Sequence, residues 1–273
     1  MAKKILQPIV LKLGGTEGLD FRAICEDIAA LNWAGPLVVV HGGSAEANAL
    51  GEELKRPARF VTSPSGFTSR YTDRATLEIF TMAVNGKVNT LLVEQLQGLG
   101  VNAIGLSGLD GRLIRAKRKG AIRILENGKR KVLRGDYTGR IESVDGQFLF
   151  GLLDMGLTPV IAPLAMGEAG EALNVDADRA AAAIAAALGA GKLLLFTAAP
   201  GLMRRYPDES TLIRRLGASQ LEGAYEFAQG RMKKKVLGAQ EAIQGGVPEV
   251  IIADGRISQP VSTALNGGGT LIS

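Results

Sequence analysis

The chain has 273 residues, of which 46% are hydrophobic and 22% are charged, and its formal net charge is +5. This much apolar material can build a core, so the composition excludes a wholly disordered chain. No apolar run reaches the roughly 18 residues of a membrane span, and Gln7, Pro8 and Lys12 interrupt the start, which predicts a first strand and no signal peptide. Cys25 and His41 are each the only residue of their type, so we expect no internal disulfide, no zinc site and a cytoplasmic protein.

Positive charge is concentrated in one segment. Residues 110–140 contain eleven Lys or Arg and three Asp or Glu, a local net charge of +8 in a chain of net +5. A segment this basic predicts an acidic partner or an acidic substrate. Its one aromatic residue is Tyr137 and it shows no recognition-helix pattern, so we do not expect it to bind nucleic acid.

Short apolar runs alternate with segments of helical spacing along most of the chain. Buried strands rich in Val, Ile and Leu that alternate with helices predict an α/β fold with a mainly parallel sheet covered on both faces. We expect two lobes, residues 1–188 and 189–273, with a cleft between them. The predicted strands are 9–13, 36–40, 101–106, 158–162, 192–197, 249–253 and 270–272, and the predicted helices are 21–31, 45–54, 73–99 (in two pieces near Asn85 and Gly86), 177–188, 232–244 and 261–265.

The basic segment interrupts this alternation. Residues 112–115, 121–125 and 131–134 alternate in polarity as strands do, and Asn127 followed by Gly128 is typical of a tight hairpin turn. We therefore expect a small antiparallel hairpin that carries the basic charges.

Two glycine turns follow the first two predicted strands. Residues 12–15 read Lys-Leu-Gly-Gly, and residues 41–43 read His-Gly-Gly. Glycines at the carboxyl ends of parallel strands let backbone N–H groups approach an anion, to which a lysine adds a positive charge. Neither segment has the P-loop or dinucleotide-binding pattern, so ordinary turns remain an alternative. His41 could be an acid–base catalyst, although a local hydrogen bond is the more frequent role of such a histidine.

Three later segments carry further candidates. Arg70 could hold a carboxylate in a bidentate contact, or be a solvated arginine beside a helix cap. Asn174 could contact substrate and Asp178 could position ammonium groups, or the local acids could merely favour the helix dipole. Lysines 233–235 begin a predicted helix, where the dipole disfavours positive charge, which indicates a phosphate ligand unless the run is only solvated.

The candidates include no pair of a nucleophile and a base. Phosphoryl transfer to a carboxylate needs none, because a carboxylate is already ionised at neutral pH and catalysis reduces to alignment and charge neutralisation. Two lysines from opposite lobes, kept in place by one aspartate, would suffice.

Six segments of the chain resemble motifs of the amino acid kinase family, and specifically of its acetylglutamate kinase branch, in order and in spacing. They are residues 12–15, 41–43, 70–73, 174–178, 200–202 and 232–236. The resemblance covers essentially the whole chain and implies a three-layer α/β sandwich of the carbamate kinase type. It implies an acceptor site in lobe 1–188, and ATP with its Mg²⁺ in lobe 189–273, without a metal site built by the protein. The implied roles are transition-state stabilisation by Lys12 and Lys235, their organisation by Asp178, substrate binding by Gly42, Gly43, Arg70 and Asn174, and nucleotide binding by Gly14, Gly15, Gly201 and Lys235.

Within that branch, the chain resembles the LysW-aminoadipate kinases of bacterial lysine synthesis. The resemblance lies in residues 68–73, 105–111, 134–139 and 230–235. The resemblance implies that ATP phosphorylates the side-chain carboxylate of α-aminoadipate to an acyl phosphate while the amino acid is attached to a small acidic carrier protein. Residues 112–134 would then be the surface on which the carrier docks. The first strand begins near the start of the chain, without the extra helix of hexameric relatives, so we expect a homodimer.

Four alternatives remain open. Two are close: an acetylglutamate kinase of arginine synthesis, and a bifunctional kinase that accepts carrier-bound aminoadipate and carrier-bound glutamate. A nucleic-acid-binding regulator and an inactive ATP-sensing relative belong to other classes. The presence of Lys12, Asp178 and Lys235 argues against an inactive protein.

Overall fold

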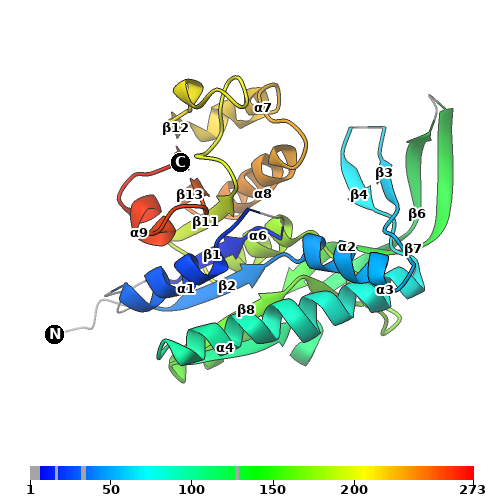
Figure 1. The fold of residues 1–273 in the computed structure, drawn as a ribbon, viewed down its shortest axis with the longest axis horizontal. Coiled ribbons are helices and arrows are strands. Elements are labelled where there is room, and N and C mark those ends of the chain that lie inside the picture. The colour runs from blue at the N-terminus through cyan, green and yellow to red at the C-terminus, as the bar shows by residue number, and fades with distance from the viewer. Residues whose placement is uncertain (1–6, 16–17, 32–34, 65, 127–128) are drawn as a thin grey trace.

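The structure, a computed structural model, describes residues 7–15, 18–31, 35–64, 66–126 and 129–273. Its centre is a mainly parallel eight-stranded sheet, with helices on both faces (Figure 1). In spatial order its strands are β12 (Arg215–Leu216), β14 (Thr270–Ile272), β13 (Glu249–Asp254), β11 (Lys192–Thr197), β1 (Ile9–Leu13), β2 (Leu37–His41), β8 (Thr158–Ala162) and β5 (Ala103–Ser107). The pair β13–β14 is antiparallel, and the other pairs are parallel.

Two apolar cores sandwich this sheet. Strand β1 shows why, since Ile9, Leu11 and Leu13 point into one core and Val10 points into the other, the two-residue period of a strand. The first core packs β1 and β2 against α1 (Phe21–Ala30), α4 (Thr90–Gly98) and α9 (Pro260–Leu265). The second packs them against α5 (Gly146–Asp154), α6 (Ala177–Ala187) and α8 (Met232–Gln244).

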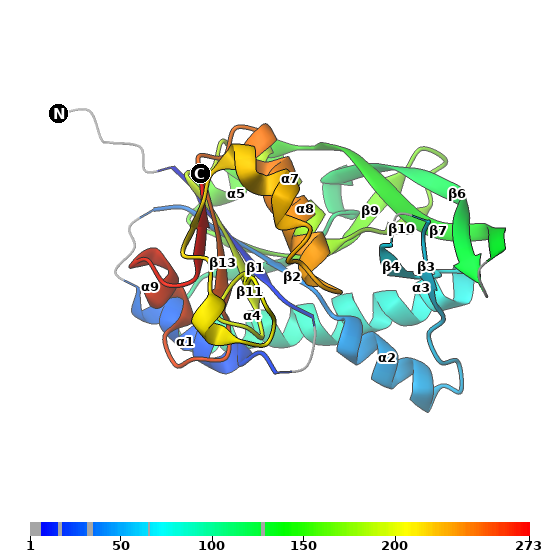
Figure 2. The same ribbon diagram turned by 90° about the horizontal axis from the view of Figure 1, so that it is seen from above.

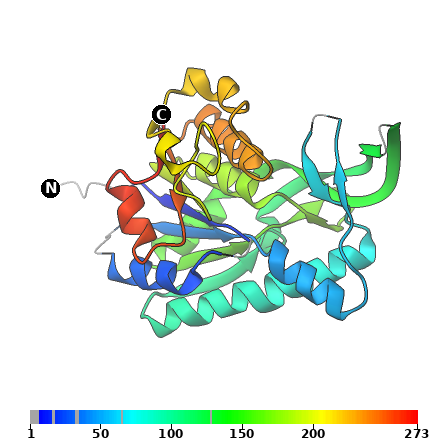
Figure 3. The same cartoon turned by 45° about the horizontal axis from the view of Figure 1, so that its top comes forward.

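A second, six-stranded sheet lies at one end of the molecule, away from α1 and α9 (Figures 2 and 3). Its long hairpin, β6 and β7, stands beside the short hairpin β3–β4. Its strands, in spatial order, are β4 (Thr68–Arg70), β3 (Phe60–Thr62), β6 (Ile114–Glu126), β7 (Lys129–Val144), β10 (Ala172–Asn174) and β9 (Leu164–Gly167).

The structure confirms each predicted strand of the main sheet and changes two other predictions. The helix at 73–99 is one continuous rod and not two pieces: α3 (Arg74–Thr81), a π-helical segment η1 (Met82–Asn89) and α4 follow one another. The wider π turns keep the side chains of Val84 and Asn89 buried, and because of this packing the helix continues through Asn85 and Gly86 without the predicted break. The basic segment is one long hairpin with register shifts around Gly120, and its predicted turn residues Asn127 and Gly128 lie outside the described residues.

The remaining helices are α2 (Ser44–Glu53), α7 (Leu221–Ala224) and three short 3₁₀ turns, η2 (Asp110–Arg112), η3 (Glu209–Thr211) and η4 (Ala218–Gln220). In the part of the chain that the structure describes, no helix has the length and apolar character needed to cross a bilayer. The main sheet draws strands from both predicted lobes, with β1 and β11 paired at its centre. The division of binding roles between residues 1–188 and 189–273 stays a prediction.

Candidate active site

Three charged side chains from distant parts of the sequence meet at one point. The ammonium nitrogens of Lys12 and Lys235 each lie 2.9 Å from the same carboxylate oxygen, Oδ1 of Asp178. All three residues are buried. Because two cations share one carboxylate, this cluster keeps a net positive charge and is suited to receive an anion.

Three elements bring the cluster together. Lys12 follows Val10 by two residues on β1, so its side chain leaves the sheet on the face that α6 and α8 cover. Asp178 lies in the first turn of α6, whose N-cap Asp176 accepts a hydrogen bond from the backbone N–H of Asp178. Lys235 lies in the first turn of α8. A methyl group at Gly238 would lie 3.1 Å from the backbone oxygen of Asp178, so this glycine allows the two helices to approach closely.

The geometry separates the three consecutive lysines of α8. Lys235 donates a hydrogen bond to Asp178, whereas Lys234 forms an ion pair of 3.1 Å with Asp176. The ammonium nitrogen of Lys233 reaches toward Gly66 in the β3–β4 hairpin, 4.0 Å from the position that a Cβ would take there. Lysine 235 is therefore the member of the run that lies in the cluster.

The charges of the cluster are strongly coupled. Burial alone would raise the pKa of Asp178, but Lys12 and Lys235 together hold the pKa of this carboxyl below its usual range. Burial lowers the pKa of Lys235 to about 8, although Asp178 opposes the shift. Lysine 235 is therefore mainly charged at neutral pH and loses its proton as the pH rises through about 8.

Arg70 is a buried cation at the end of β4. Its guanidinium donates to the side-chain oxygen of Asn48 at 2.6 Å and to the backbone oxygen of Ser44 at 3.2 Å, and it lies over the ring of Phe60. These acceptors are neutral. Burial lowers the pKa of Arg70 to about 10, and the charge of Arg231 adds to this shift. A buried guanidinium without a carboxylate partner among the described residues is suited to an acidic ligand.

Asn174 is tied to Arg70 through Thr72. The hydroxyl of Thr72 accepts a hydrogen bond from the amide of Asn174 at 3.1 Å and donates to the backbone oxygen of Arg70 at 3.2 Å. The fully buried Asp136 in turn accepts from the backbone N–H groups of Thr72, at 2.9 Å, and Thr138, at 3.2 Å. Sequence reasoning assigned no role to Asp136, although an acid in so basic a strand is a signal that could have identified it.

The two glycine turns touch each other. A Cβ on Gly15 would overlap the backbone of Gly43, and a Cβ on Gly42 would lie 2.6 Å from the backbone nitrogen of Gly15. The backbone N–H of Ala45 donates to the oxygen of Gly15 at 2.8 Å. Gly14 lies between Lys12 and this contact. The turns that were predicted at one sheet edge therefore lie against each other at the start of α2.

Gly201 lies elsewhere on the sheet edge. It follows β11, and a Cβ there would lie 2.6 Å from the hydroxyl of Thr270 at the start of β14. That hydroxyl accepts from the backbone N–H of Leu202 at 2.9 Å. No hydrogen bond or ion pair among the described residues joins Gly201 to the cluster of Lys12, Asp178 and Lys235, so its predicted role in nucleotide binding stays a prediction.

His41 is fully buried and is held by local hydrogen bonds. Its ring nitrogens lie 2.7 Å from the backbone oxygen of Gly42 and 2.9 Å from the amide nitrogen of Asn89. Burial lowers the pKa of His41 to about 4. These contacts favour the local hydrogen-bonding role over acid–base catalysis.

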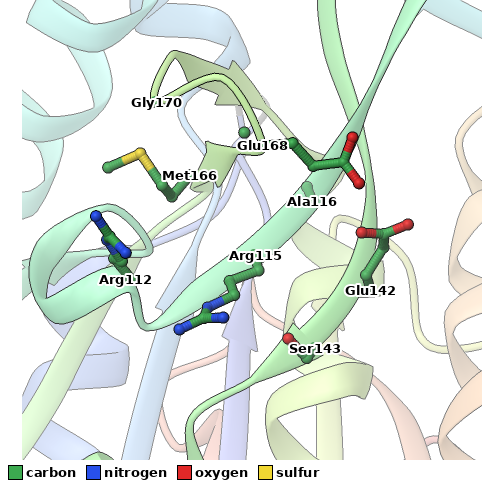
Figure 4. Close-up of a pocket in the computed structure, with 9 residues that line it drawn as sticks. Arg112, Arg115, Ala116, Glu142, Ser143, Met166, Glu168 and Gly170 are labelled. Atoms are coloured by element: carbon green, nitrogen blue, oxygen red, sulfur yellow. The ribbon is translucent and has the colours of Figure 1, made fainter.

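A cavity of about 450 Å³ lies apart from these residues. It is open to solvent and is lined by residues of η2, β6, β7, β9 and the β9–β10 turn, with Arg112 and Arg115 on one side and Glu142 and Glu168 on the other (Figure 4). None of the predicted site residues lines it. In the described ranges, no three His, Cys, Asp or Glu side chains are grouped as metal ligands.

Comparison with known proteins relates the chain to kinases that act on amino acids. The amino acid kinase family matches residues 7–254. A LysW-aminoadipate kinase of Deinococcus radiodurans is 55% identical over 271 residues, covering 99% of this chain and 93% of the relative. One of Thermus thermophilus is 50% identical over 267 residues, covering 97% and 99%. A protein of Cenarchaeum symbiosum, whose name proposes LysW-aminoadipate and LysW-glutamate kinase activities, is 46% identical over 260 residues, covering 94% and 96%.

Solved structures share the fold. N-acetylglutamate synthase from Neisseria gonorrhoeae, complexed with coenzyme A and N-acetyl-glutamate, has a TM-score of 0.79 at 26% identity. That match covers 99% of this chain and 60% of the synthase. Giardia carbamate kinase has a TM-score of 0.69 at 16% identity, covering 98% of both chains. The predicted α/β sandwich of the carbamate kinase type is therefore confirmed.

Proposed function

The chain belongs to the amino acid kinase family, and from this premise we propose that it uses ATP to phosphorylate the side-chain carboxylate of α-aminoadipate attached to the carrier protein LysW. The observation that carries the proposal is the convergence of Lys12 and Lys235 on Asp178, in a chain 55% identical to a LysW-aminoadipate kinase. The product is an acyl phosphate, an intermediate of lysine synthesis.

The chemistry needs no general base. A carboxylate oxygen attacks the γ-phosphorus of ATP, the bond to the β–γ bridging oxygen breaks, and ADP leaves with the electron pair. Lys12 and Lys235 neutralise the charge on the phosphoryl group in flight, and Asp178 holds both ammonium groups in place. Mg²⁺ bound to ATP would supply further charge neutralisation at the phosphates.

The two lobes divide the ligands. The acceptor binds to residues of lobe 1–188, namely Gly42, Gly43, Arg70 and Asn174. The buried guanidinium of Arg70, whose charge no carboxylate compensates among the described residues, supports this role. Residues 189–273 bind ATP, with contributions from Gly201 and Lys235 and, across the sheet edge, Gly14 and Gly15.

The carrier docks on the basic hairpin, which we define as residues 112–134. Its side chains Lys117, Arg123 and Arg130 are exposed. The hairpin is tied to the residue that follows Arg70, because the hydroxyl of Tyr71 donates to the backbone oxygen of Arg134 at 2.7 Å, where Arg134 pairs with Ala121 partway along the hairpin. An acidic carrier held there by long-range attraction would present its bound amino acid close to Arg70.

The test of the activity is ADP release with four acceptors: carrier-bound aminoadipate, carrier-bound glutamate, free N-acetylglutamate and free aminoadipate. We expect kcat/KM to be highest for carrier-bound aminoadipate. Comparable turnover of carrier-bound glutamate would make the enzyme bifunctional, an alternative favoured by the name of the Cenarchaeum relative. Turnover of free N-acetylglutamate alone would refute the proposal.

The docking surface is tested by charge reversal. We expect the double variant Lys129→Glu with Arg130→Glu to raise KM for the carrier-bound substrate several-fold, which corresponds to a loss of roughly 1 kcal/mol of binding free energy. The dependence of this KM on salt concentration should become weaker. Arg214→Glu with Arg215→Glu is the matched control, because these arginines are also exposed and adjacent but lie next to β14, at the other edge of the fold. Equal effects of the two pairs would count against docking on the hairpin.

We further propose that the protein is a homodimer that works in the cytoplasm. Met82, in η1, and Leu91, in α4, are about half exposed, which supports an apolar contact there. Cys25 is the only cysteine, so no disulfide of the chain calls for an oxidising compartment. Sedimentation equilibrium at micromolar concentration distinguishes a dimer of about 57 kDa from the 28.6 kDa monomer.

A further inference from the structure

A chain of buried hydrogen bonds ends at the second glycine turn. His41 closes β2, and its Nδ1 lies 2.7 Å from the backbone oxygen of Gly42. Its Nε2 lies 2.9 Å from Nδ2 of Asn89, which also lies 2.8 Å from the backbone oxygen of Val160. Asn89 is the last residue of the π-helical segment η1, and both His41 and Asn89 are buried.

These contacts assign the protons of the imidazole. A backbone oxygen only accepts, so the atom of Asn89 that faces Val160 must be the NH₂ group. Its second hydrogen faces Nε2 of His41 at 2.9 Å, a better acceptor than the backbone oxygen of Leu106 at 3.4 Å, so Nε2 accepts this hydrogen and must carry no proton. The remaining nitrogen, Nδ1, carries the proton and donates it to the oxygen of Gly42. A doubly protonated ring would set two donors against each other at Asn89.

The hydrogen bond to Gly42 also orients the next N–H group. In a trans peptide the C=O and N–H of one unit point in opposite directions. Because the oxygen of Gly42 is held by the imidazole, the N–H of Gly43 points away from it. Gly43 is the N-cap residue of α2, and no side chain caps this helix start. An N–H group with this orientation at a helix start is a donor for an anion.

We propose that His41 is a positioning residue, whose neutral Nδ1–H tautomer, imposed by Asn89, holds the Gly42–Gly43 peptide so that the Gly43 N–H faces the anionic reactants. The proposal rests on the proposed function, in which Gly43 contacts the acceptor. His41 itself touches no reacting atom.

The surroundings of His41 keep this state constant with pH. Burial lowers the pKa of the ring to about 4, and the nearby Lys12 of β1 adds to the shift, while the hydrogen bond to Gly42 opposes it. Among the residues that the structure describes, Lys12 is the one charged side chain that contributes to this shift. The ring therefore stays neutral throughout the range in which the enzyme would work.

The tautomer can be measured directly, without substrate. His41 is the only histidine of the chain, so the ring of ¹⁵N-histidine-labelled protein gives one unambiguous pair of nitrogen signals. We expect Nδ1 to be protonated, Nε2 to be unprotonated, and neither signal to titrate between about pH 5.5 and 8. A protonated Nε2, or a titration in this range, would overturn the proposal.

Two substitutions test the consequence for catalysis. In His41→Asn, the amide nitrogen takes nearly the place of Nδ1 and can still donate to Gly42, whereas His41→Leu has no donor. With MgATP and carrier-bound aminoadipate, we expect kcat to fall about tenfold or more in His41→Leu, and to stay within about threefold of the wild type in His41→Asn. KM for ATP should change little in either variant.

Equal losses in both variants, or no loss in His41→Leu, would contradict the positioning role. If His41→Leu does not fold, Asn89→Asp takes its place, because a carboxylate oxygen can only accept a hydrogen bond from Nε2, whereas the amide of Asn89 donates one to it. We expect a protonated Nε2 in the nitrogen spectrum of this variant, and an Nε2 that stays unprotonated would refute the role of Asn89. Activity of the wild type toward the carrier-bound substrate is measured separately, so failure of the proposed function is distinguishable from failure of this inference.

Discussion

Replacing Asp178 with Asn removes the charge that holds two ammonium groups together. The nitrogens of Lys12 and Lys235 are at most about 6 Å apart, because each lies 2.9 Å from the same oxygen. At an effective dielectric constant of about 20, two unit charges at this distance repel by roughly 3 kcal/mol. Asp178→Asn keeps the shape of the side chain and leaves this repulsion uncompensated.

Loss of a proton from Lys235 relieves the repulsion most easily. Its pKa in the wild type is already lowered to about 8, and Asp178 is the group that opposes the lowering. Without that carboxylate, the pKa of Lys235 falls further, so the charged form is lost at a lower pH. At pH 7.5 one of the two cations that stabilise the transition state is then missing, and we expect kcat to fall by roughly 10²–10³-fold.

The assay is the pH profile of kcat/KM, from coupled ADP release with carrier-bound aminoadipate. In the wild type we expect activity to fall as the pH rises through about 8, and in Asp178→Asn the fall should begin at lower pH. Asp176→Asn is the matched control, because it removes a neighbouring acid while asparagine preserves the helix cap. An alkaline limb at the same pH in Asp178→Asn and the wild type would refute the reasoning.

Two further substitutions test the acceptor side. Arg70→Lys should raise KM for the acceptor roughly tenfold, since an ammonium group cannot hold Ser44 and a carboxylate at once. KM for ATP should stay within about twofold of the wild-type value, and an equal rise of KM for ATP would contradict an acceptor role. Asp136→Asn turns an acceptor into a donor beside two N–H groups and should lower the free energy of unfolding by about 1–3 kcal/mol in urea, together with a higher acceptor KM. The exposed Asp208→Asn is its control, and equal destabilisation by both would argue against a special role of Asp136.

The main sheet could be predicted because its strands are buried on both faces and read as continuous apolar runs. The second sheet could be predicted only in part. Strands β3, β4, β9 and β10 are three or four residues long, too short to show a period. The antiparallel basic hairpin was predicted from its alternating polarity, but the register shifts near Gly120 interrupt that alternation, so the full length of β6 and β7 was not.

The site was predictable to different degrees. The glycine turns follow from the rule that ligands meet the carboxyl ends of parallel strands, whereas the roles of Lys12, Asp178 and Lys235 came from the resemblance to a family. The partners of Arg70 lie on α2, and Asp136 meets Thr72 across 64 positions of sequence. Such contacts depend on how separate elements pack, and no local pattern encodes them.

The burial of the sole histidine has a consequence for the outer surface. The ordinary pKa values of carboxylates lie near 4 and those of lysine and arginine lie above about 10, and the single His and the single Cys are buried. Among the described residues, therefore, no exposed side chain is of a type that changes its charge near neutrality. Electrophoretic mobility and retention on a cation exchanger should accordingly stay flat from about pH 6 to 7.5. The contribution of the enzyme's surface to the attraction of an acidic partner protein should therefore depend on ionic strength and not on pH in this range.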